Sequence, residues 1–300
     1  MPFIDSSIET YNNSRHYSSH LNTHGPYAML AEVKMIEETV SLETNEEIGN
    51  NIWLMEFRSP SLASRAQPGQ FLMVHVSKRT KDPLLRRPFS IHGIQDRATV
   101  MLLYNKVGAG TALLSTLKKH DSISIIGPLG NGFTLPGPRE STLLLAGGMG
   151  LAPLFFLVQA LQKAQKNVGK VFVGFSTSEQ VVRFEQLKEL GVDLSLTTED
   201  GSLGSKGVVT DLLEGYLGSE VQEKPVIYGC GPLSMLKKVA HRAAALNLKC
   251  YVSLEGYMAC GLGICLGCAV KSAPGEKKPY YYVCQDGPVF PSRAIDWEVL

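Results

Sequence analysis

The chain has 300 residues, a formal net charge of +1 and charged side chains at 19% of its positions. This length predicts two domains with room for a small additional module. Because neither sign of charge prevails, the composition excludes the basic surface that nucleic-acid binding requires, and small molecules or proteins are the expected partners. The longest apolar segment, at 151–161, has about half the length that spans a bilayer. We therefore expect a cytoplasmic protein without membrane contact, whose six cysteines are ligands or free thiols rather than disulfides.

The first half of the chain predicts a tail followed by a barrel. Residues 1–25 are rich in Ser, Asn and His and lack apolar periodicity, which indicates a disordered tail. Residues 26–138 contain six short β-rich runs separated by glycine and proline turns, which favour an antiparallel β-barrel domain. The runs are YAMLAEVKMI, NIWLMEF, QFLMVHV, PFSIHGI, ATVMLLY and SISIIG, and one helix is expected near 110–119.

The second half changes to an alternation of strands and helices. In residues 139–247, the strands TLLLA and KVFVGF flank a helix in LAPLFFLVQALQKA, and further helices are expected near 208–215 and at 233–246. This alternation is typical of a doubly wound parallel sheet. Residues 248–300 begin with the strand YVSL, hold a cysteine cluster and contain another strand at 280–283. The predicted fold is therefore multidomain: a β-barrel, a Rossmann-like α/β domain and a small C-terminal module.

Two short glycine turns follow buried strands in the α/β domain, one in LLLAGGMGLAP and one in YGCGP. Glycine lets the backbone approach a phosphate at a helix N-terminus, although any tight strand-to-helix turn also favours glycine. Because ligands bind at the carboxyl ends of parallel strands, the two turns together predict one dinucleotide site. The candidate residues are Gly147, Gly148, Gly150, Cys230, Gly231 and Pro232.

The choice of coenzyme depends on the segment after KVFVGF. Residues 176–179 contain no Arg or Lys pair that could hold a 2′-phosphate, which favours NADH over NADPH, although Arg183 lies nearby in the sequence. Cys230 is expected close to the nicotinamide ring, as a buried thiol without a covalent role.

The segment LLRRPFSI places an arginine, a proline, an aromatic residue and a hydroxyl at the start of an expected strand. A flavin can use these types, since Arg87 can neutralise phosphate, Phe89 can stack and Ser90 can reach the polar edge of the ring. VGAGT, at 107–111, opens the barrel helix and offers amides to a diphosphate. Taken alone, the segment could also be an ordinary strand with a surface arginine. The flavin candidates are Arg87, Pro88, Phe89, Ser90, Leu103, Tyr104, Asn105, Gly110 and Thr111.

Four cysteines near the C-terminus have the spacing Cys260-x4-Cys265-x2-Cys268-x15-Cys284. The first three match the C-x4-C-x2-C spacing of plant-type [2Fe–2S] ligation, which a distant fourth cysteine completes. Glycines at 261, 263 and 267 suit a loop that curls around a cluster and turns its amides toward the sulfides. The alternative is a zinc site with four cysteine ligands, although such sites usually pair C-x2-C with C-x2-C. Cys250 lies outside this spacing and is expected to be a core thiol.

The motifs RRPFSI, GAGT, AGGMGLAP and CGP, in this order, resemble the ferredoxin–NADP reductase superfamily over residues 27–245. SLEGYMACGLGICLGC and VCQDGPVF closely resemble the electron-transfer subunits of class 1B dihydroorotate dehydrogenases, and TEDGSLGSKGVVTD and YGCGPLSML extend this resemblance. The resemblance implies FAD bound by the barrel, NAD bound by the Rossmann-like domain, and a [2Fe–2S] cluster on the four cysteines. Phe89 stands where many members of the superfamily have tyrosine, so a phenol hydrogen bond to the flavin is not available.

By the same resemblance, the partner is an FMN-containing catalytic subunit that oxidises (S)-dihydroorotate to orotate in de novo pyrimidine biosynthesis. Electrons would pass from that FMN through [2Fe–2S] and FAD to NAD⁺, within a heterotetramer. The cofactors are expected to carry all the redox chemistry, because no acid–base or nucleophilic constellation for a pyrimidine is present. Lys271, Lys277 and Lys278 could dock the partner or belong to a solvated loop. The alternatives are an NAD(P)H-linked reductase subunit for another partner, in sulfur or ferredoxin metabolism, and a zinc-stapled nucleotide-binding module.

Overall fold

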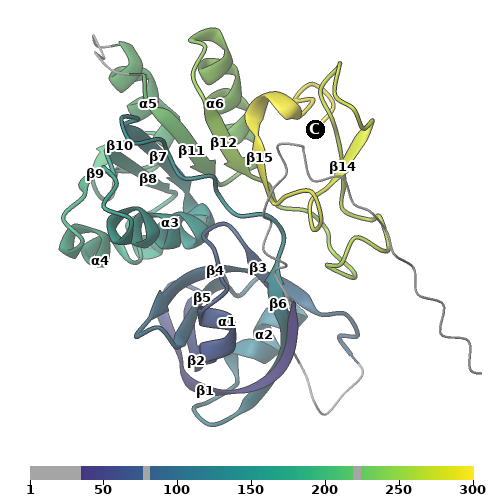
Figure 1. Ribbon diagram of the computed structural model, residues 1–300. Coiled ribbons are helices and arrows are strands. Elements are labelled where there is room, and N and C mark those ends of the chain that lie inside the picture. Colours follow the sequence, from purple (N-terminus) through teal and green to yellow (C-terminus); the bar gives the residue numbers. More distant parts are fainter. Residues whose placement is uncertain (1–34, 77–81, 219–223) are drawn as a thin grey trace, which may run out of the picture. The chain divides into compact units, whose positions relative to one another are not determined.

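The structure, a computed structural model, describes residues 35–76, 82–218 and 224–300 (Figure 1). The predicted tail at 1–25 and most of the first predicted run lie outside these residues. Six antiparallel strands close a barrel in the order β1-β2-β5-β4-β3-β6, which confirms the predicted barrel, although its first strand covers 36–49 and begins only at the last residue of the first predicted run. They are β1 (Ile36–Gly49), β2 (Ile52–Arg58), β3 (Phe71–His75), β4 (Arg87–Gln95), β5 (Thr99–Asn105) and β6 (Ser122–Leu129).

Alternating side chains fill the interior of the barrel. In β6, Ile123 and Ile125 are buried, whereas Ser122 and Ser124 are partly exposed on the outer face. This period of two is what a strand with one buried face requires. The inward side chains of the six strands form one core, so the barrel is a filled domain whose binding surfaces lie on its outside.

Two short helices belong to the barrel domain, α1 (Pro60–Ala63) and α2 (Ala109–Ser115). Helix α2 ends before the predicted limit of 119. The hydroxyl groups of Ser115 and Thr116 donate to carbonyl oxygens of the preceding turn, which competes with further helix. Within the described ranges, no helix combines the length and the apolar content needed to cross a bilayer.

A seven-stranded sheet forms the second domain, in the order β10-β9-β8-β7-β11-β12-β15. All neighbours are parallel except β12 and β15. The strands are β7 (Thr142–Gly147), β8 (Lys170–Phe175), β9 (Asp193–Thr198), β10 (Ser205–Lys206), β11 (Val226–Cys230), β12 (Cys250–Ser253) and β15 (Val289–Pro291). Because β8 and β11 lie on opposite sides of β7, the sheet is doubly wound, as the sequence predicts.

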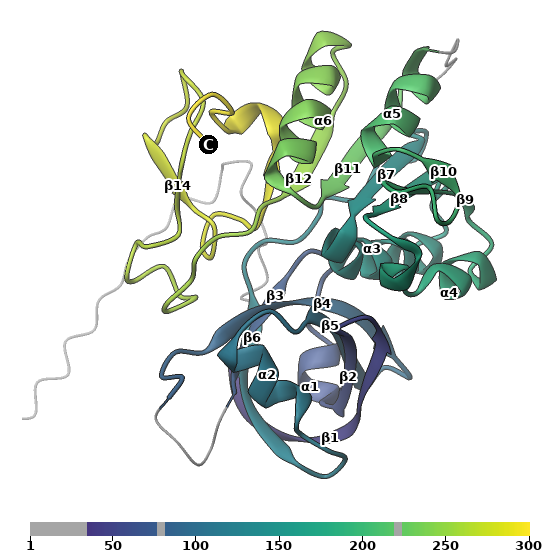
Figure 2. The ribbon, with the colours of Figure 1, turned by 180° about the vertical axis from the view of Figure 1, so that it is seen from behind.

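Helices cover both faces of this sheet (Figure 2). They are α3 (Leu151–Lys163), α4 (Phe184–Glu189), α5 (Val209–Gly218) and α6 (Leu233–Ala245), with the 3-10 turns η1 (Gly148–Gly150), η2 (Ser178–Gln180) and η3 (Ser292–Ala294). Leu144 of β7 packs with α3 and α4, whereas its neighbours Leu143 and Leu145 pack with α5 and α6. Burial on both faces explains why TLLLA is continuously apolar.

The C-terminal module contains the cysteine loop and a two-stranded sheet of β13 (Ala269–Lys271) and β14 (Tyr280–Tyr282). Strands β12 and β15, which also belong to the predicted module, pair with each other and extend the nucleotide sheet through β11. The segment between them leaves the sheet after β12 and returns at β15. The module is therefore a long excursion from one edge of the sheet.

Candidate functional site

A cavity of about 520 Å³ lies beside the barrel, lined by the barrel, by α3 and by the segment after β12. Its size and mixed lining are typical of a small-molecule or cofactor site. The flavin candidates all line it: Arg87, Pro88, Phe89, Ser90, Leu103, Tyr104, Asn105, Gly110 and Thr111. The candidates of β4 and β5 meet here because these strands are antiparallel neighbours. The structure thus brings these residues together, and their contact with a flavin stays a prediction.

Phe89 and Tyr104 form the aromatic part of this cavity. Their rings meet edge to face with centroids 5.7 Å apart, and Trp53 stacks on Tyr104 at 6.4 Å. The Tyr104 hydroxyl donates to Asn45 Oδ1 at 2.9 Å, and burial raises the pKa of this phenol. The hydroxyl is thus engaged within the barrel, and the two rings offer the cavity an apolar surface on which a flat ligand can stack.

Arg87 lies over the start of α2. A Cβ atom added to Gly110 would lie 3.1 Å from Arg87 Nε, so the absence of a side chain there leaves room for the guanidinium group. The Thr111 hydroxyl accepts hydrogen bonds from the amides of Val107 and Gly108, and it therefore builds the turn itself. A cation over an open glycine turn, beside an aromatic wall, fits a flavin nucleotide with its diphosphate.

A second cavity, of about 200 Å³, lies at the carboxyl ends of β7, β8 and β9. Gly147, Gly148 and Pro232 line it, as the sequence predicts for a nucleotide site. The Thr197 hydroxyl in its wall is buried and has no hydrogen-bond partner among the residues described here, so a bound ligand could satisfy it. Lys238, which sequence reasoning did not single out, adds a positive charge. This sheet edge is where dinucleotides bind in doubly wound folds.

The other nucleotide candidates lie around neighbouring spaces. Gly150 and Gly231 line an adjacent cavity of about 350 Å³, and Cys230 lines the flavin cavity. Gly150 marks the point where the two predicted turns touch, because a Cβ atom there would lie 1.9 Å from the Cys230 carbonyl oxygen. Burial raises the pKa of the Cys230 thiol to about 12, which keeps it protonated.

Glu255 is a site residue to which sequence reasoning gave no role. It lines both the flavin cavity and the adjacent cavity that holds Gly150 and Gly231. Partial desolvation raises the pKa of its carboxyl group, although the residue as a whole is exposed. A partly desolvated carboxyl group between two cavities can retain a proton at a higher pH than a fully solvated one. The sequence signal was its place in SLEGYMACGLGICLGC, the segment whose resemblance implies the cluster.

We expect Glu255→Gln to raise the melting temperature only slightly at neutral pH, because the Glu255 side chain is exposed and solvent screens most of the cost of its charge. Because the folded state raises the pKa of this carboxyl group, its stabilising contribution is present below the unfolded pKa and is lost as pH rises through the folded pKa. The advantage of glutamine should therefore shrink toward about pH 4. The difference in melting temperature between the two proteins is measured by thermal unfolding from about pH 4 to neutral pH. Glu46→Gln, at another exposed position, is the control. A difference that does not vary with pH would contradict the assignment.

The four cysteines of the predicted cluster form two pairs. The sulfur atoms of Cys268 and Cys284 lie 3.3 Å apart. Cys260 and Cys265 form the second pair, since the Cys265 amide donates to Cys260 Sγ at 3.5 Å and the two side chains also interact. The Gly263 amide donates to Cys284 Sγ at 3.1 Å and connects the pairs. A [2Fe–2S] cluster takes four cysteine thiolates on two irons, so two pairs fit it.

A single metal ion fits this donor set less well. Among the described residues, no three His, Cys, Asp or Glu side chains come close enough together to hold one ion. A structural zinc site needs four ligands around one centre. The six cysteines form no disulfides. Two pairs of cysteine sulfur atoms match the two irons of a [2Fe–2S] cluster, with two cysteine ligands for each iron.

Left-handed backbone gives the cysteine loop its curl. Gly261 and Gly263 have φ values of +71° and +75°, and Leu266 has +59°. Gly267, which was predicted to serve this purpose, does not have a positive φ, and Leu266 takes that conformation instead. Burial raises the pKa of the Cys260 thiol, but hydrogen bonds from loop amides outweigh burial and lower this pKa to about 6. The loop thus favours the thiolate, which is the form that binds metal.

Two segments of the chain match described protein families. Residues 255–296 match the iron-sulfur cluster binding domain of dihydroorotate dehydrogenase B. Residues 144–241 match the oxidoreductase NAD-binding domain. The first match contains the four paired cysteines, and the second contains the glycine turn after β7 and most of α6.

Relatives match over most of the chain. It is 39% identical over 252 residues to the electron transfer subunit of dihydroorotate dehydrogenase B (NAD(+)) from Desulforamulus reducens, covering 84% of this chain and 95% of that one. The subunit of the same name from Caldanaerobacter subterraneus is 38% identical over 248 residues, covering 82% and 93%. Among solved structures, the NADH-dependent reduced ferredoxin-NADP oxidoreductase matches with a TM-score of 0.77 and 28% identity, covering 87% and 91%.

Proposed function

Because the chain belongs to the family of dihydroorotate dehydrogenase B electron transfer subunits, we propose that it carries electrons from a dihydroorotate-oxidising partner to NAD⁺. In this proposal the chain serves de novo pyrimidine biosynthesis. Electrons enter through a [2Fe–2S] cluster, reach FAD and leave as hydride. The substrate itself is oxidised on the partner.

The four cysteines hold the cluster, the cavity beside the barrel holds FAD, and the sheet edge at Gly147 and Gly148 holds NAD⁺. When bound, FAD exchanges single electrons with iron–sulfur centres and hydride with NAD⁺. The residues of the chain bind and orient these groups and exclude water from them. Arg87 binds phosphate, Phe89 and Tyr104 border the flavin ring, and the glycine turns admit the coenzyme.

The observation that carries this proposal is that strand β3 contacts both redox sites. Phe71 lines the flavin cavity. Met73, two residues along, packs against the cysteine loop, since a Cβ atom at Gly261 would lie 2.4 Å from Met73 Cγ. Both residues share a core with Cys268 and Cys284. One strand therefore contacts both sites, which suits direct electron passage between them.

The outer part of the cysteine loop suits a partner surface. Cys265 is exposed, and Tyr257, Ile264 and Leu266 expose 97%, 76% and 49% of their surface. Apolar side chains around an exposed metal ligand favour contact with an apolar surface of another protein. Such contact would bring a redox group of the partner close to the cluster.

The partner in this proposal is an FMN-containing catalytic subunit, in a cytoplasmic heterotetramer with two chains of each kind. Two of the three lysines considered for docking already have contacts within the module. Lys271 lies over the Tyr280 ring with its Nζ 4.8 Å from the centroid, and Lys278 pairs with Asp286 at 2.6 Å. Both side chains are thus engaged within the module.

Arg87→Ala should weaken FAD retention by about tenfold or more, because a charge-assisted hydrogen bond to phosphate is lost. The ratio of flavin absorbance to protein after purification and dialysis measures this. Arg86→Ala is the matched control, since Arg86 pairs with Glu37 at 2.6 Å and bonds to Ser124, away from the cavity. Full flavin content in the Arg87 variant would count against this role.

The proposal is tested on the purified chain. We expect stoichiometric FAD, two irons per chain as [2Fe–2S] clusters require, and anaerobic bleaching of flavin and cluster by NADH. A colourless protein that contains zinc and no iron would contradict the proposal and support a zinc-stapled nucleotide-binding module.

A further inference from the structure

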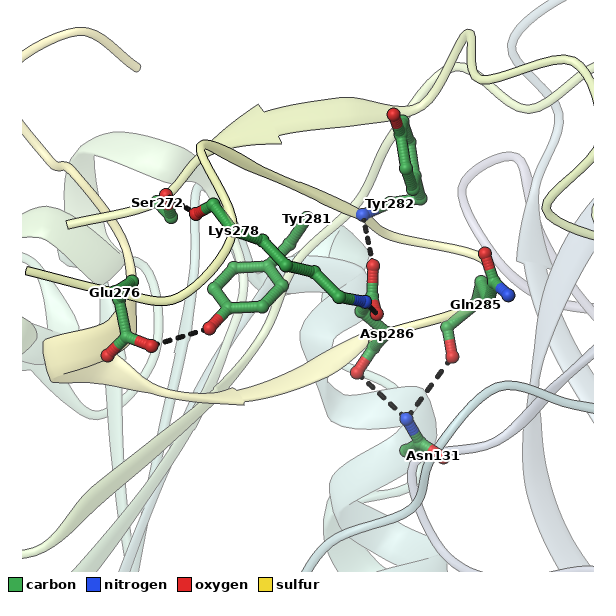
Figure 3. A network of polar contacts seen from close by, with 8 residues as sticks. All are labelled: Asn131, Ser272, Glu276, Lys278, Tyr281, Tyr282, Gln285 and Asp286. Carbon is green, nitrogen blue, oxygen red and sulfur yellow. Dashed lines mark hydrogen bonds and ion pairs between the residues drawn. The ribbon is translucent and has the colours of Figure 1, made fainter.

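One asparagine fastens the turn that carries Cys284 to the barrel. Asn131 follows β6, and its Nδ2 donates to the carbonyl oxygens of Gln285 at 3.3 Å and Asp286 at 2.8 Å. Its backbone amide donates to the Gly287 carbonyl oxygen at 2.6 Å. Figure 3 shows the Asn131 carboxamide facing the backbone of 285 and 286. Three hydrogen bonds from one barrel residue thus hold the segment that directly follows a candidate cluster ligand.

The turn is also fixed from within the module. The Asp286 carboxylate accepts from the Tyr282 amide at 2.8 Å and pairs with Lys278 Nζ at 2.6 Å (Figure 3). The amides of Gln285 and Asp286 both donate to the Tyr282 carbonyl oxygen. Because these contacts stay inside the module, they set the shape of the turn, and Asn131 sets where the turn meets the barrel.

The turn at 285–286 also supports the rest of the cysteine loop. A Cβ atom at Gly263 would lie 2.7 Å from Gln285 Oε1, so the Gln285 side chain packs directly on the loop between Cys260 and Cys265. Movement of the turn would therefore shift both cysteine pairs together.

We propose that Asn131 is a positioning residue for electron transfer, which fixes the cluster relative to the flavin cavity through the turn at 285–286. Asn131 does not line the flavin cavity and is not one of the candidate cluster ligands. Each passage oxidises one of the two centres and reduces the other by a single electron, and no bond forms or breaks at the asparagine. This inference rests on the proposed function, because it requires both groups to be bound.

Three variants test the inference. Asn131→Leu removes the side-chain donors without adding charge, and Asn131→Gln retains a carboxamide donor on a longer side chain. Asn50→Leu is the matched control, because Asn50 is a barrel residue whose Nδ2 donates to Glu179 Oε2 at 3.0 Å, in the nucleotide domain. Anaerobic stopped-flow mixing with NADH follows flavin and cluster absorbance separately. Hydrogen exchange of the amides of residues 285–287 reports on the turn without depending on turnover.

We expect every variant to retain FAD and iron and to reduce its flavin at the wild-type rate. In Asn131→Leu, cluster reduction should slow by about tenfold and exchange of the 285–287 amides should accelerate by about the same factor, as the loss of two modest hydrogen bonds implies. In Asn131→Gln, the rates of cluster reduction and of amide exchange should both lie between those of Asn131→Leu and wild type. Asn50→Leu should have wild-type values for both rates.

Wild-type cluster reduction in Asn131→Leu, or loss of its iron, would overturn the positioning role. A different result would overturn the proposed function instead: a wild-type chain with both groups bound whose cluster stays oxidised after NADH reduces the flavin.

Discussion

A Cys265→Ser variant should be purified with its FAD but without the [2Fe–2S] cluster. Cys265 is an exposed member of the Cys260 pair, and it does not line the flavin cavity. Serine does not supply the thiolate that iron–sulfur ligation uses. Iron analysis and the visible spectrum measure the loss. Electron transfer to a partner should be abolished, while NADH oxidation by an artificial acceptor continues at the flavin.

The matched control is Cys250→Ser. Cys250 is a buried thiol in β12, outside the four paired cysteines, and should affect stability alone. If Cys265→Ser lost NADH oxidation by the artificial acceptor as completely as electron transfer to a partner, the flavin would depend on the cluster loop. That result would contradict the separation of the two sites.

A Gly150→Ala variant should be strongly destabilised. The added Cβ atom would lie 1.9 Å from the Cys230 carbonyl oxygen and 2.6 Å from the Gly231 nitrogen. Gly150 has φ −59°, which alanine adopts readily, so the effect comes from collision with main-chain atoms and not from backbone strain. We expect the free energy of unfolding to fall by about 3 kcal/mol, at the upper end for overpacking. Urea denaturation measures this, and KM for NADH should also rise.

Gly215→Ala provides the control for this change in the same domain. Gly215 lies in α5, and a Cβ atom there meets nothing within 4 Å. Alanine should therefore stabilise the helix by about 0.5–1 kcal/mol. A Gly150→Ala protein as stable as wild type would contradict the contact between the two turns.

The parts of the fold that depend on local pattern were predictable from the sequence. The alternation of Ile123 and Ile125 with serines indicates a barrel strand, and the continuous TLLLA run indicates a strand buried on both faces. The cysteine spacing also identifies the candidate ligands directly, because three ligands of a [2Fe–2S] cluster come from one loop and therefore lie only a few residues apart in the sequence. These signals need no knowledge of distant residues.

Features that depend on contacts between distant segments were not predictable in the same way. Glu255 stands between two cavities only because β12 extends the nucleotide sheet beside the barrel. Asn131 meets residues more than 150 positions away, and nothing in its neighbourhood in the sequence marks it. Gly150 stays a predicted phosphate-binding position, and its close approach to the Cys230 carbonyl is a packing requirement between two turns that the sequence does not reveal.

The most direct test of the account is dihydroorotate-dependent reduction of NAD⁺ under anaerobic conditions. The chain is co-purified with the FMN-containing catalytic subunit, and the chain is omitted in a parallel control. We predict NADH formation only when this chain is present with its flavin and iron. A complex replete in flavin and iron that oxidises dihydroorotate but forms no NADH would contradict the account.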